Sequence, residues 1–256
     1  MENASYYFSQ IDAQQLPSLD RLVCSDKNRK MLDSLVFEYR NRERLDDMQI
    51  PRRSTILIQG QSGTGKDLCA SALAHECGLP LRLVHTASIF SEDEDRSIER
   101  LHDLFQTVID ERALYLVADL GSSLDLSSRH RTASSLVSVL RANKNYGQSL
   151  VVVTSRRGYA KNEAFARIFD MVLTFTKPST AEIDRLFNIY FPSFPKREIT
   201  NRIYTTCEDM VHGDVTRALV QARIESERTG KVVSQSQLLN IFVDNLHSIR
   251  FSFSAS

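Results

Sequence analysis

Short apolar segments alternate with longer amphipathic segments through the middle of this 256-residue chain. Five segments are rich in aliphatic and β-branched residues and too short for buried helices. They are residues 54–59, 81–85, 114–118, 150–154 and 171–175. The segments between them carry apolar side chains at helical spacing, at 67–76, 97–110 and 131–142. This alternation predicts an α/β fold, a five-stranded parallel sheet with helices on both faces.

The flanks of this region show helical patterns only. Residues 19–47 place apolar side chains at helical spacing, so residues 1–53 are predicted to be a helical lead-in to an α/β core at 54–177. After residue 177 the strand pattern stops, and Ser179-Thr180-Ala181-Glu182 fits a capping box that starts a helix. Further helical patterns follow at 197–210, 214–226 and 234–246. We therefore expect residues 178–256 to form a small, all-helical subdomain.

Charge and cysteine content narrow the class of protein. Lys+Arg and Asp+Glu each number 32, so the formal net charge is zero and no general attraction to nucleic acid or an anionic membrane is expected. No apolar stretch approaches the roughly 20 residues of a membrane-spanning helix. The polar N-terminus lacks the pattern of a secretory signal peptide, so a cytoplasmic protein is expected.

The four cysteines form no CxxC pair and are predicted to be buried thiols.

A glycine-rich loop follows the first predicted strand. It consists of Gly60, Gln61, Ser62, Gly63, Thr64, Gly65, Lys66 and Asp67, and an Ala-rich helix continues from it with Leu68. This context is typical of a phosphate-binding loop, in which backbone N–H groups and a helix N-terminus face phosphate oxygens while the lysine neutralises the β and γ phosphates. We predict that residues 60–68 bind a nucleotide, ATP or ADP.

The last loop position is unusual, because Asp67 stands where a Ser or Thr hydroxyl ordinarily binds Mg²⁺. A carboxylate can bind Mg²⁺, but beside a triphosphate it adds a repulsion of about 1–4 kcal/mol. Asp67 therefore predicts weak or metal-independent nucleotide binding. The alternative is that the loop binds no nucleotide and that Asp67 only stabilises the first helical turn.

A second acid, Asp119, follows the third predicted strand, where it can lie beside the loop and hold Mg²⁺ through water. With this acid and the loop, the chain resembles the AAA+ superfamily of P-loop ATPases, in particular compact members with one AAA+ sheet and one helical lid. Asp67 and Asp119 are then the candidate metal ligands, and a requirement for Mg²⁺ stays open. In that family a water-activating Glu follows the acid. Here Leu120 takes its place and cannot accept a proton, so hydrolysis is expected to be weak or absent.

The resemblance assigns roles to residues at other positions. Thr154 and Ser155 match the first sensor, which orients water against the γ-phosphate, with Ser in place of the usual Asn. Arg167 matches one of two arginines that reach a neighbouring subunit's nucleotide, and Ile168 replaces the other. In the lid, Arg217 stands one residue later than the family's phosphate-contacting Arg, a rotation of about 100° around a helix.

The family's substrate-threading loop would lie near residues 89–96. Four consecutive acids at 92–95 replace its aromatic residues, so threading of a polypeptide or binding of DNA there is disfavoured. We predict a solvated acidic loop, and docking to a basic partner is the functional alternative.

Three interpretations follow from these positions. The first is a nucleotide-binding protein with a degraded hydrolysis site, a regulatory or structural subunit that assembles as a homo-oligomer or with an active AAA+ relative or another protein. The second is an active ATPase that remodels a protein partner and uses Asp67 as an unusual metal ligand. The third is a DNA-binding loader or initiator-like ATPase, for which basic residues such as Arg156 and Arg157 would form a local basic edge on the surface.

Overall fold

The computed structural model describes residues 6–120, 130–146, 148–156 and 167–254. The chain divides into two compact units. The first contains residues 26–60 and 66–174, together with the residues before Val23. The second contains residues 23–25, 61–65 and those from Phe175 onward.

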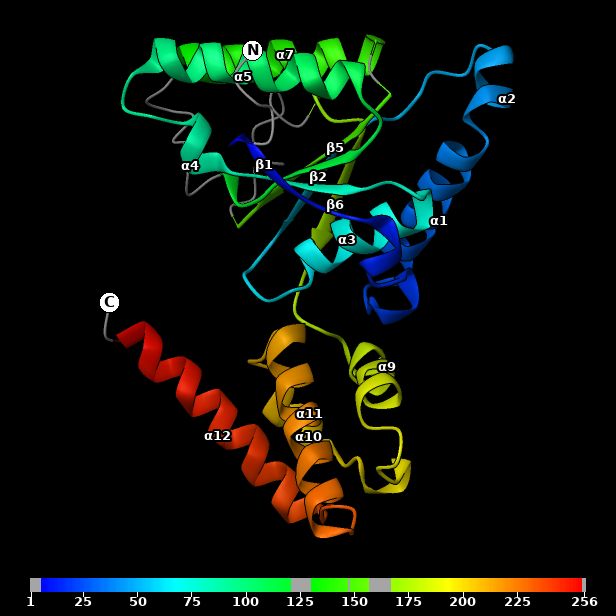
Figure 1. The fold of residues 1–256 in the computed structure, drawn as a ribbon. Coiled ribbons are helices and arrows are strands. Elements are labelled where there is room, and N and C mark those ends of the chain that lie inside the picture. The colour runs from blue at the N-terminus through cyan, green and yellow to red at the C-terminus, as the bar shows by residue number, and fades with distance from the viewer. Residues whose placement is uncertain (1–5, 121–129, 147, 157–166, 255–256) are drawn as a thin grey trace. The chain divides into compact units, whose positions relative to one another are not determined.

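A six-stranded sheet forms the centre of the first unit (Figure 1). Its strands are β1 (Phe8–Ile11), β2 (Thr55–Gly60), β3 (Leu81–Val84), β4 (Leu114–Val117), β5 (Leu150–Ser155) and β6 (Met171–Phe175), in the order β1-β3-β4-β5-β2-β6. The pairs β3–β4, β4–β5 and β2–β5 are parallel, which confirms the predicted α/β sheet. Strand β1 was not predicted, and it pairs antiparallel with β3 at the edge of the sheet.

Helices cover both faces of this sheet. They are α1 (Asp26–Arg40), α2 (Arg42–Asp47), α3 (Lys66–Cys77), α4 (Thr86–Ile89), α5 (Glu94–Asp110) and α7 (His130–Tyr146), with the short 3₁₀ helices η2 (Ala13–Gln15) and η3 (Leu19–Arg21). Helices α5 and α7 lie side by side over one face, and α1 and α3 lie over the other (Figure 1). The strands bury their aliphatic side chains against Leu101, Leu104, Phe105, Leu136 and Leu140 from α5 and α7.

The acidic run at 92–95 leads into helix α5: Glu92 and Asp93 precede the helix, Glu94 and Asp95 begin it, and all but Glu94 are exposed. Asp93 is the N-cap, and its carboxylate accepts from the backbone N–H groups of Asp95 and Arg96. The Glu94 carboxylate accepts from the backbone N–H of Thr132, and Asp95 pairs with Arg131. Asp93, Glu94 and Asp95 therefore help to fix the start of α5 and its contact with α7.

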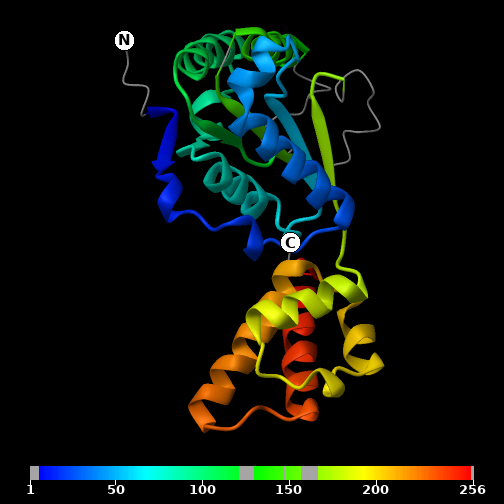
Figure 2. The ribbon, with the colours of Figure 1, turned by 90° about the vertical axis from the view of Figure 1, so that its right-hand side faces the viewer.

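The second unit is helical apart from its connections, as predicted. Its helices are α9 (Thr180–Tyr190), the 3₁₀ helix η5 (Lys196–Glu198), α10 (Asn201–Cys207), α11 (His212–Thr229) and α12 (Gln235–Ser254) (Figure 2). They enclose a core that includes Phe187, Phe191, Phe194, Ile203 and Phe242.

The predicted capping box of α9 is present. The Ser179 N–H donates to the Glu182 carboxylate, and the Glu182 N–H donates to the Ser179 hydroxyl. Burial alone would raise the pKa of Glu182, but the bonds from Ser179 and the proximity of His212 outweigh it and lower that pKa to about 2.

All four cysteines are free and buried, as the sequence predicted. Burial raises the pKa of the Cys77 and Cys207 thiols to about 12, which leaves them protonated and unreactive at neutral pH. Within the part of the chain that the structure describes, no helix has the length and apolar character needed to cross a membrane.

Candidate functional site

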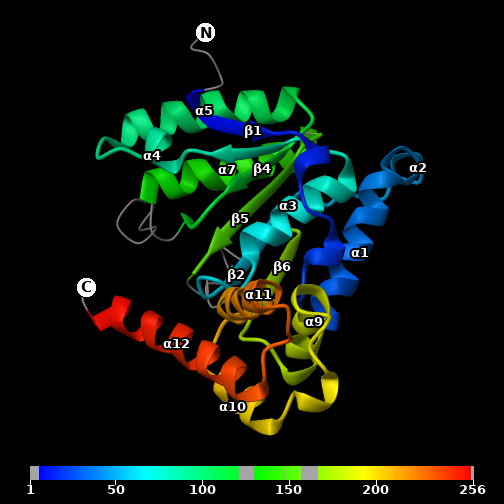
Figure 3. The same cartoon turned by 60° about the horizontal axis from the view of Figure 1, so that its bottom comes forward.

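The glycine-rich loop connects β2 to α3, as its sequence context predicted (Figure 3). Strand β2 lies between β5 and β6, is buried over most of its length and ends at Gly60. The Lys66 Nζ donates to the carbonyl oxygen of Gly60 over 2.8 Å, so the lysine folds back across the start of the loop. Asp67 is exposed on the first turn of α3, and Leu68 is half-buried beside it.

Lys66 lies within the field of both predicted metal ligands. Burial lowers the pKa of Lys66, while the carboxylates of Asp67 and Asp119 act to raise it and the Arg156 guanidinium acts to lower it further. Two cationic and two anionic side chains therefore interact electrostatically in the first unit. Counted together, the charges of Lys66, Arg156, Asp67 and Asp119 sum to zero.

The middle of the loop, residues 61–65, packs against the start of α11. The Gly213 N–H donates to the carbonyl oxygen of Gly63 over 2.8 Å. A Cβ on Gly63 would lie 2.7 Å from Val211 Cγ2, and one on Gly213 would lie 3.1 Å from the Gly63 oxygen. Gly63 also has φ +79°, which L side chains rarely adopt. Both glycines are therefore needed for this close approach, and sequence analysis gave no role to Gly213.

Asp119 lies beyond the end of β4, next to the end of β5. Its N–H donates to the Thr154 hydroxyl over 3.0 Å, and its backbone has φ 50°. Its carboxylate forms an ion pair with the guanidinium of Arg156, the residue that follows β5. Their hydrogen bond raises the pKa of Arg156. The predicted residues Asp119 and Thr154 are brought together, and Arg156, predicted only as a basic edge, joins them.

Leu120 and Ser155 point away from solvent. Leu120 has no exposed surface and belongs to the core between the sheet and helices α5 and α7. Ser155 is likewise fully buried, at the end of β5. The left-handed backbone of Asp119 helps the chain turn so that Asp119 and Leu120 take opposite environments. A side chain at position 120 therefore packs in the core in this structure.

The remaining predicted positions lie on surfaces or in the core. Arg167 is exposed, while Ile168 is 6% exposed and packs in the core of the first unit. Arg217 is exposed on α11, with its guanidinium 3.7 Å from the Asp214 carboxylate one helical turn earlier. Arg157 lies outside the described residues.

The metal-binding capacity of this site is limited by its own ion pair. Carboxylate oxygens suit Mg²⁺, but the Asp119 carboxylate is paired with a guanidinium, and Asp67 supplies the other carboxylate. Among the described residues, no group of three or more His, Cys, Asp or Glu side chains is arranged to hold a metal ion. In the described geometry these residues do not fit Mg²⁺ without breaking the pair.

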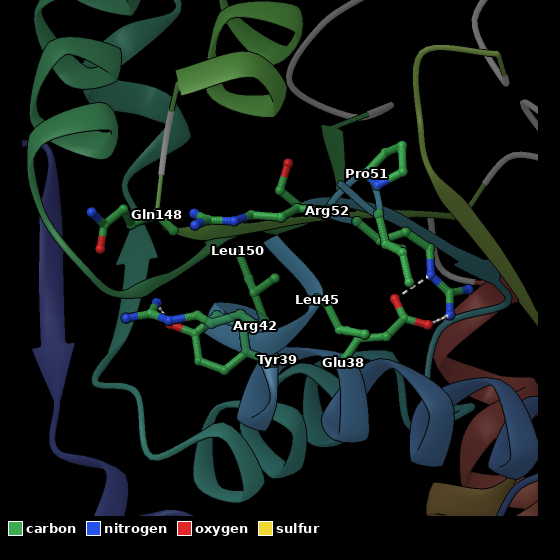
Figure 4. Close-up of a pocket in the computed structure, with 12 residues that line it drawn as sticks. Glu38, Tyr39, Arg42, Leu45, Pro51, Arg52, Gln148 and Leu150 are labelled. Carbon is green, nitrogen blue, oxygen red and sulfur yellow. Dashed lines mark hydrogen bonds and ion pairs between the residues drawn. The ribbon is translucent and has the colours of Figure 1, made fainter. Parts of the chain in front are cut away.

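A separate pocket lies at the other end of the sheet, where β2 and β5 begin. Its lining includes Tyr39, Arg42, Leu45 and Leu150, and the Glu38 carboxylate on its wall is paired with Arg53 (Figure 4). The bond from Arg53 lowers the pKa of Glu38. Charged side chains that line the pocket are thus paired with other side chains of the protein, as in Glu38 with Arg53 and Arg52 with Asp46. None of the predicted site residues lines this pocket.

Comparison with known proteins agrees with the loop and the sheet. The profile of the AAA family, described as the ATPase family associated with various cellular activities, matches residues 56–177. An uncharacterized AAA family ATPase, y4kL, of Sinorhizobium fredii is 25% identical over 175 residues, 66% of this chain and 53% of that protein.

Two further similar proteins come from other organisms. A Methanothermobacter thermautotrophicus protein, provisionally named a 26S proteasome regulatory subunit homolog, is 23% identical over 55% of this chain and 40% of its own length. The AAA domain-containing protein ycf46 of Gracilaria tenuistipitata is 22% identical over 77% of this chain and 42% of its own length. The chain thus spans about half or less of each relative. The family match, the strand–loop–helix around Lys66 and the mostly parallel sheet together support an AAA+ P-loop ATPase domain over residues 56–177.

Proposed function

We propose that this chain is a nucleotide-binding AAA+ subunit with little or no ATP hydrolysis, which regulates or supports an AAA+ assembly. The observation that carries the proposal is the burial of Leu120. The family's water-activating carboxylate would stand at this position, and here the position is filled by a fully buried apolar side chain. A general base typically accelerates a reaction by a factor of about 10²–10⁴. Its loss therefore leaves a protein that binds nucleotide but hydrolyses it inefficiently.

The loop supports retention of binding. Lys66 is held against Gly60, and the Gly63 backbone keeps its turn through the contact with Gly213. Asp67 adds negative charge beside the phosphates, so ADP should bind at least as tightly as ATP. Asp67→Thr should raise ATP affinity by several-fold up to about a hundredfold, the factor that corresponds to about 1–3 kcal/mol.

The test combines calorimetry with steady-state phosphate release. We expect measurable ADP binding by the unmodified chain, loss of that binding in Lys66→Ala, and negligible phosphate release. A suitable control is Arg52→Gln, because this residue pairs with Asp46 away from the loop. Robust hydrolysis that Lys66→Ala abolishes would overturn the proposal, and so would the absence of nucleotide binding.

Assembly is the second part of the proposal. It is supported by the exposure of Arg167, whose counterpart in the family reaches a neighbouring subunit, and by the name of the Methanothermobacter relative. Arg167→Glu should weaken self-association or association with an active AAA+ relative, measured by mass in solution with nucleotide present. Arg96→Glu changes an exposed arginine on α5 by the same charge and should have less effect. Equal effects of the two changes would remove Arg167 from the interface.

A second candidate function is an active ATPase in which Asp67 binds the metal. The influence of the Asp67 carboxylate on Lys66 supports it, since it places that charge near the phosphate-neutralising group. Tighter ATP binding by the unmodified chain than by Asp67→Thr, in the presence of Mg²⁺, would favour this candidate.

A further inference from the structure

We infer that the Arg156 guanidinium serves as an internal cation in place of Mg²⁺, so that this chain binds the phosphates of a nucleotide without a divalent metal. The inference rests on the proposed nucleotide binding and adds to it the identity of the counter-ion. It comes from the ion pair of Arg156 with Asp119, the acid that would otherwise hold Mg²⁺.

The position of Arg156 gives it access to the same carboxylate that a metal would use. Arg156 follows β5 directly, and Asp119 lies just beyond β4, the strand that pairs with β5 in parallel register. The carboxyl ends of adjacent parallel strands meet at one edge of a sheet, where α/β proteins bind their ligands. The Asp119 N–H bond to Thr154 fixes the acid against β5, next to Arg156.

The exposure of Arg156 leaves it able to bind an anion while it stays paired. Its side chain is 55% exposed and that of Asp119 is 30% exposed. A guanidinium has five N–H donors in a planar fork, and the pair with one carboxylate oxygen uses only part of them. The remaining donors suit phosphate oxygens, which arginine binds in bidentate fashion.

The charge balance favours the guanidinium over the metal. Lys66 and Arg156 are cationic, Asp67 and Asp119 are anionic, and the other three groups all act electrostatically on Lys66. A divalent ion bound at Asp119 would have to displace Arg156 and would then be repelled by it. Arg156 thus supplies a second positive charge for the phosphates beside Lys66.

The first experiment compares ATP affinity in EDTA and in Mg²⁺ by calorimetry on the full chain. The unmodified chain should show less than a threefold difference between the two conditions. The Arg156→Gln variant should bind ATP at least tenfold more weakly than the unmodified chain in EDTA. In Mg²⁺ it should regain most of that affinity, because the freed Asp119 can then hold the metal. Arg52→Gln is the matched control, since it removes a similar half-exposed ion pair, with Asp46, and should change neither value.

Two results of this experiment would overturn the inference. One is a tenfold or larger gain in ATP affinity when Mg²⁺ is added to the unmodified chain. The other is an equal loss for Arg156→Gln in EDTA and in Mg²⁺, which would make Arg156 an ordinary phosphate contact.

The second experiment needs no nucleotide, so it separates this inference from the proposed function. Mn²⁺ alone is titrated and followed by electron paramagnetic resonance. Arg156→Gln should bind Mn²⁺ at least tenfold more tightly than the unmodified chain, and adding Asp119→Asn to that variant should remove the gain. If Mn²⁺ binds equally to the unmodified chain and to Arg156→Gln, Arg156 does not occupy the metal's place, whatever the nucleotide affinity.

Discussion

Asp119 and Asp170 are carboxylates beside strands of the same sheet, but their partners differ. Asp170 precedes β6, and its Oδ2 accepts from the Ser54 N–H, the Thr55 N–H and the Thr55 hydroxyl at 2.9, 3.1 and 2.9 Å. Asp119 follows β4 and pairs with a half-exposed guanidinium. Backbone donors are permanent parts of the fold, whereas an exposed guanidinium can exchange partners. Asp170 is therefore fixed to the backbone at the start of β2, whereas the ion pair of Asp119 is partly open to solvent.

The largest expected effect comes from placing an acid one residue after Asp119. Leu120→Glu puts a carboxylate among the apolar side chains of the core and should lower the free energy of unfolding by about 3–5 kcal/mol. It should not restore phosphate release. Urea unfolding measures the loss, with Leu120→Met as the control, expected to cost less than about 1.5 kcal/mol. A stable Leu120→Glu variant with increased hydrolysis would show that position 120 can face the nucleotide.

Asp170→Ala tests the structural half of the comparison. It leaves two buried backbone N–H groups at the start of β2 without their acceptor and should lower the free energy of unfolding by about 2–4 kcal/mol. Asp119→Asn should cost less than about 1 kcal/mol, because its ion pair is partly exposed and Asn tolerates the left-handed backbone at this position. Urea midpoints of the two variants, measured side by side, check this. Similar losses would contradict the distinction between the two acids.

Glu182 in the second unit extends the comparison to pH. Its pKa is lowered from 4.5 to about 2. The ionised carboxylate therefore contributes fully to the free energy of unfolding above about pH 4.5, and this contribution is lost as the pH falls toward 2. We expect Glu182→Gln to be less stable than the unmodified chain by about 1–3 kcal/mol at pH 7, with the difference shrinking below pH 4. Unfolding curves between pH 2 and 7 measure it. A difference that stays constant over this range would assign the loss to packing instead of charge.

The smallest effect is expected at Ser54, next to the pocket. Its hydroxyl is buried and has no hydrogen-bond partner in the described part of the chain, so Ser54→Ala should leave stability unchanged or raise it by up to about 1 kcal/mol. Thr55→Val is the matched control, because the Thr55 hydroxyl donates to Asp170 and its loss should cost about 1 kcal/mol. Clear destabilisation by Ser54→Ala in thermal unfolding would show that the hydroxyl has a partner.

The sheet could be predicted because its central strands are continuous apolar runs. All five expected strands are present, and the loop lies between β2 and α3 as expected. Strand β1 was missed because Ser9 and Gln10 in its middle are polar and exposed, so that it lacks the apolar run of the other strands. The start of α5 was missed because Asp93 looked like one member of an acidic run, whereas its role as a cap depends on backbone geometry.

The site was predictable by residue type but not by orientation. Lys66, Asp119 and Thr154 stand at recognisable places in the chain. Leu120 is buried directly after Asp119, whose left-handed backbone a sequence pattern does not specify. The pair between Arg156 and Asp119 arises from the adjacency of β4 and β5, so the sequence could place the guanidinium only among basic surface residues.

The bond from the Gly213 N–H to the Gly63 oxygen also provides a spectroscopic reporter. An amide exchanges with solvent only when its hydrogen bond opens, so the deuterium uptake of Gly213 records how often the loop separates from the start of α11. Any ligand that holds the loop in this conformation should slow that exchange, and any that rebuilds the loop should accelerate it. A single amide in a helix of the second unit would thus register events at a phosphate-binding loop far away in the sequence.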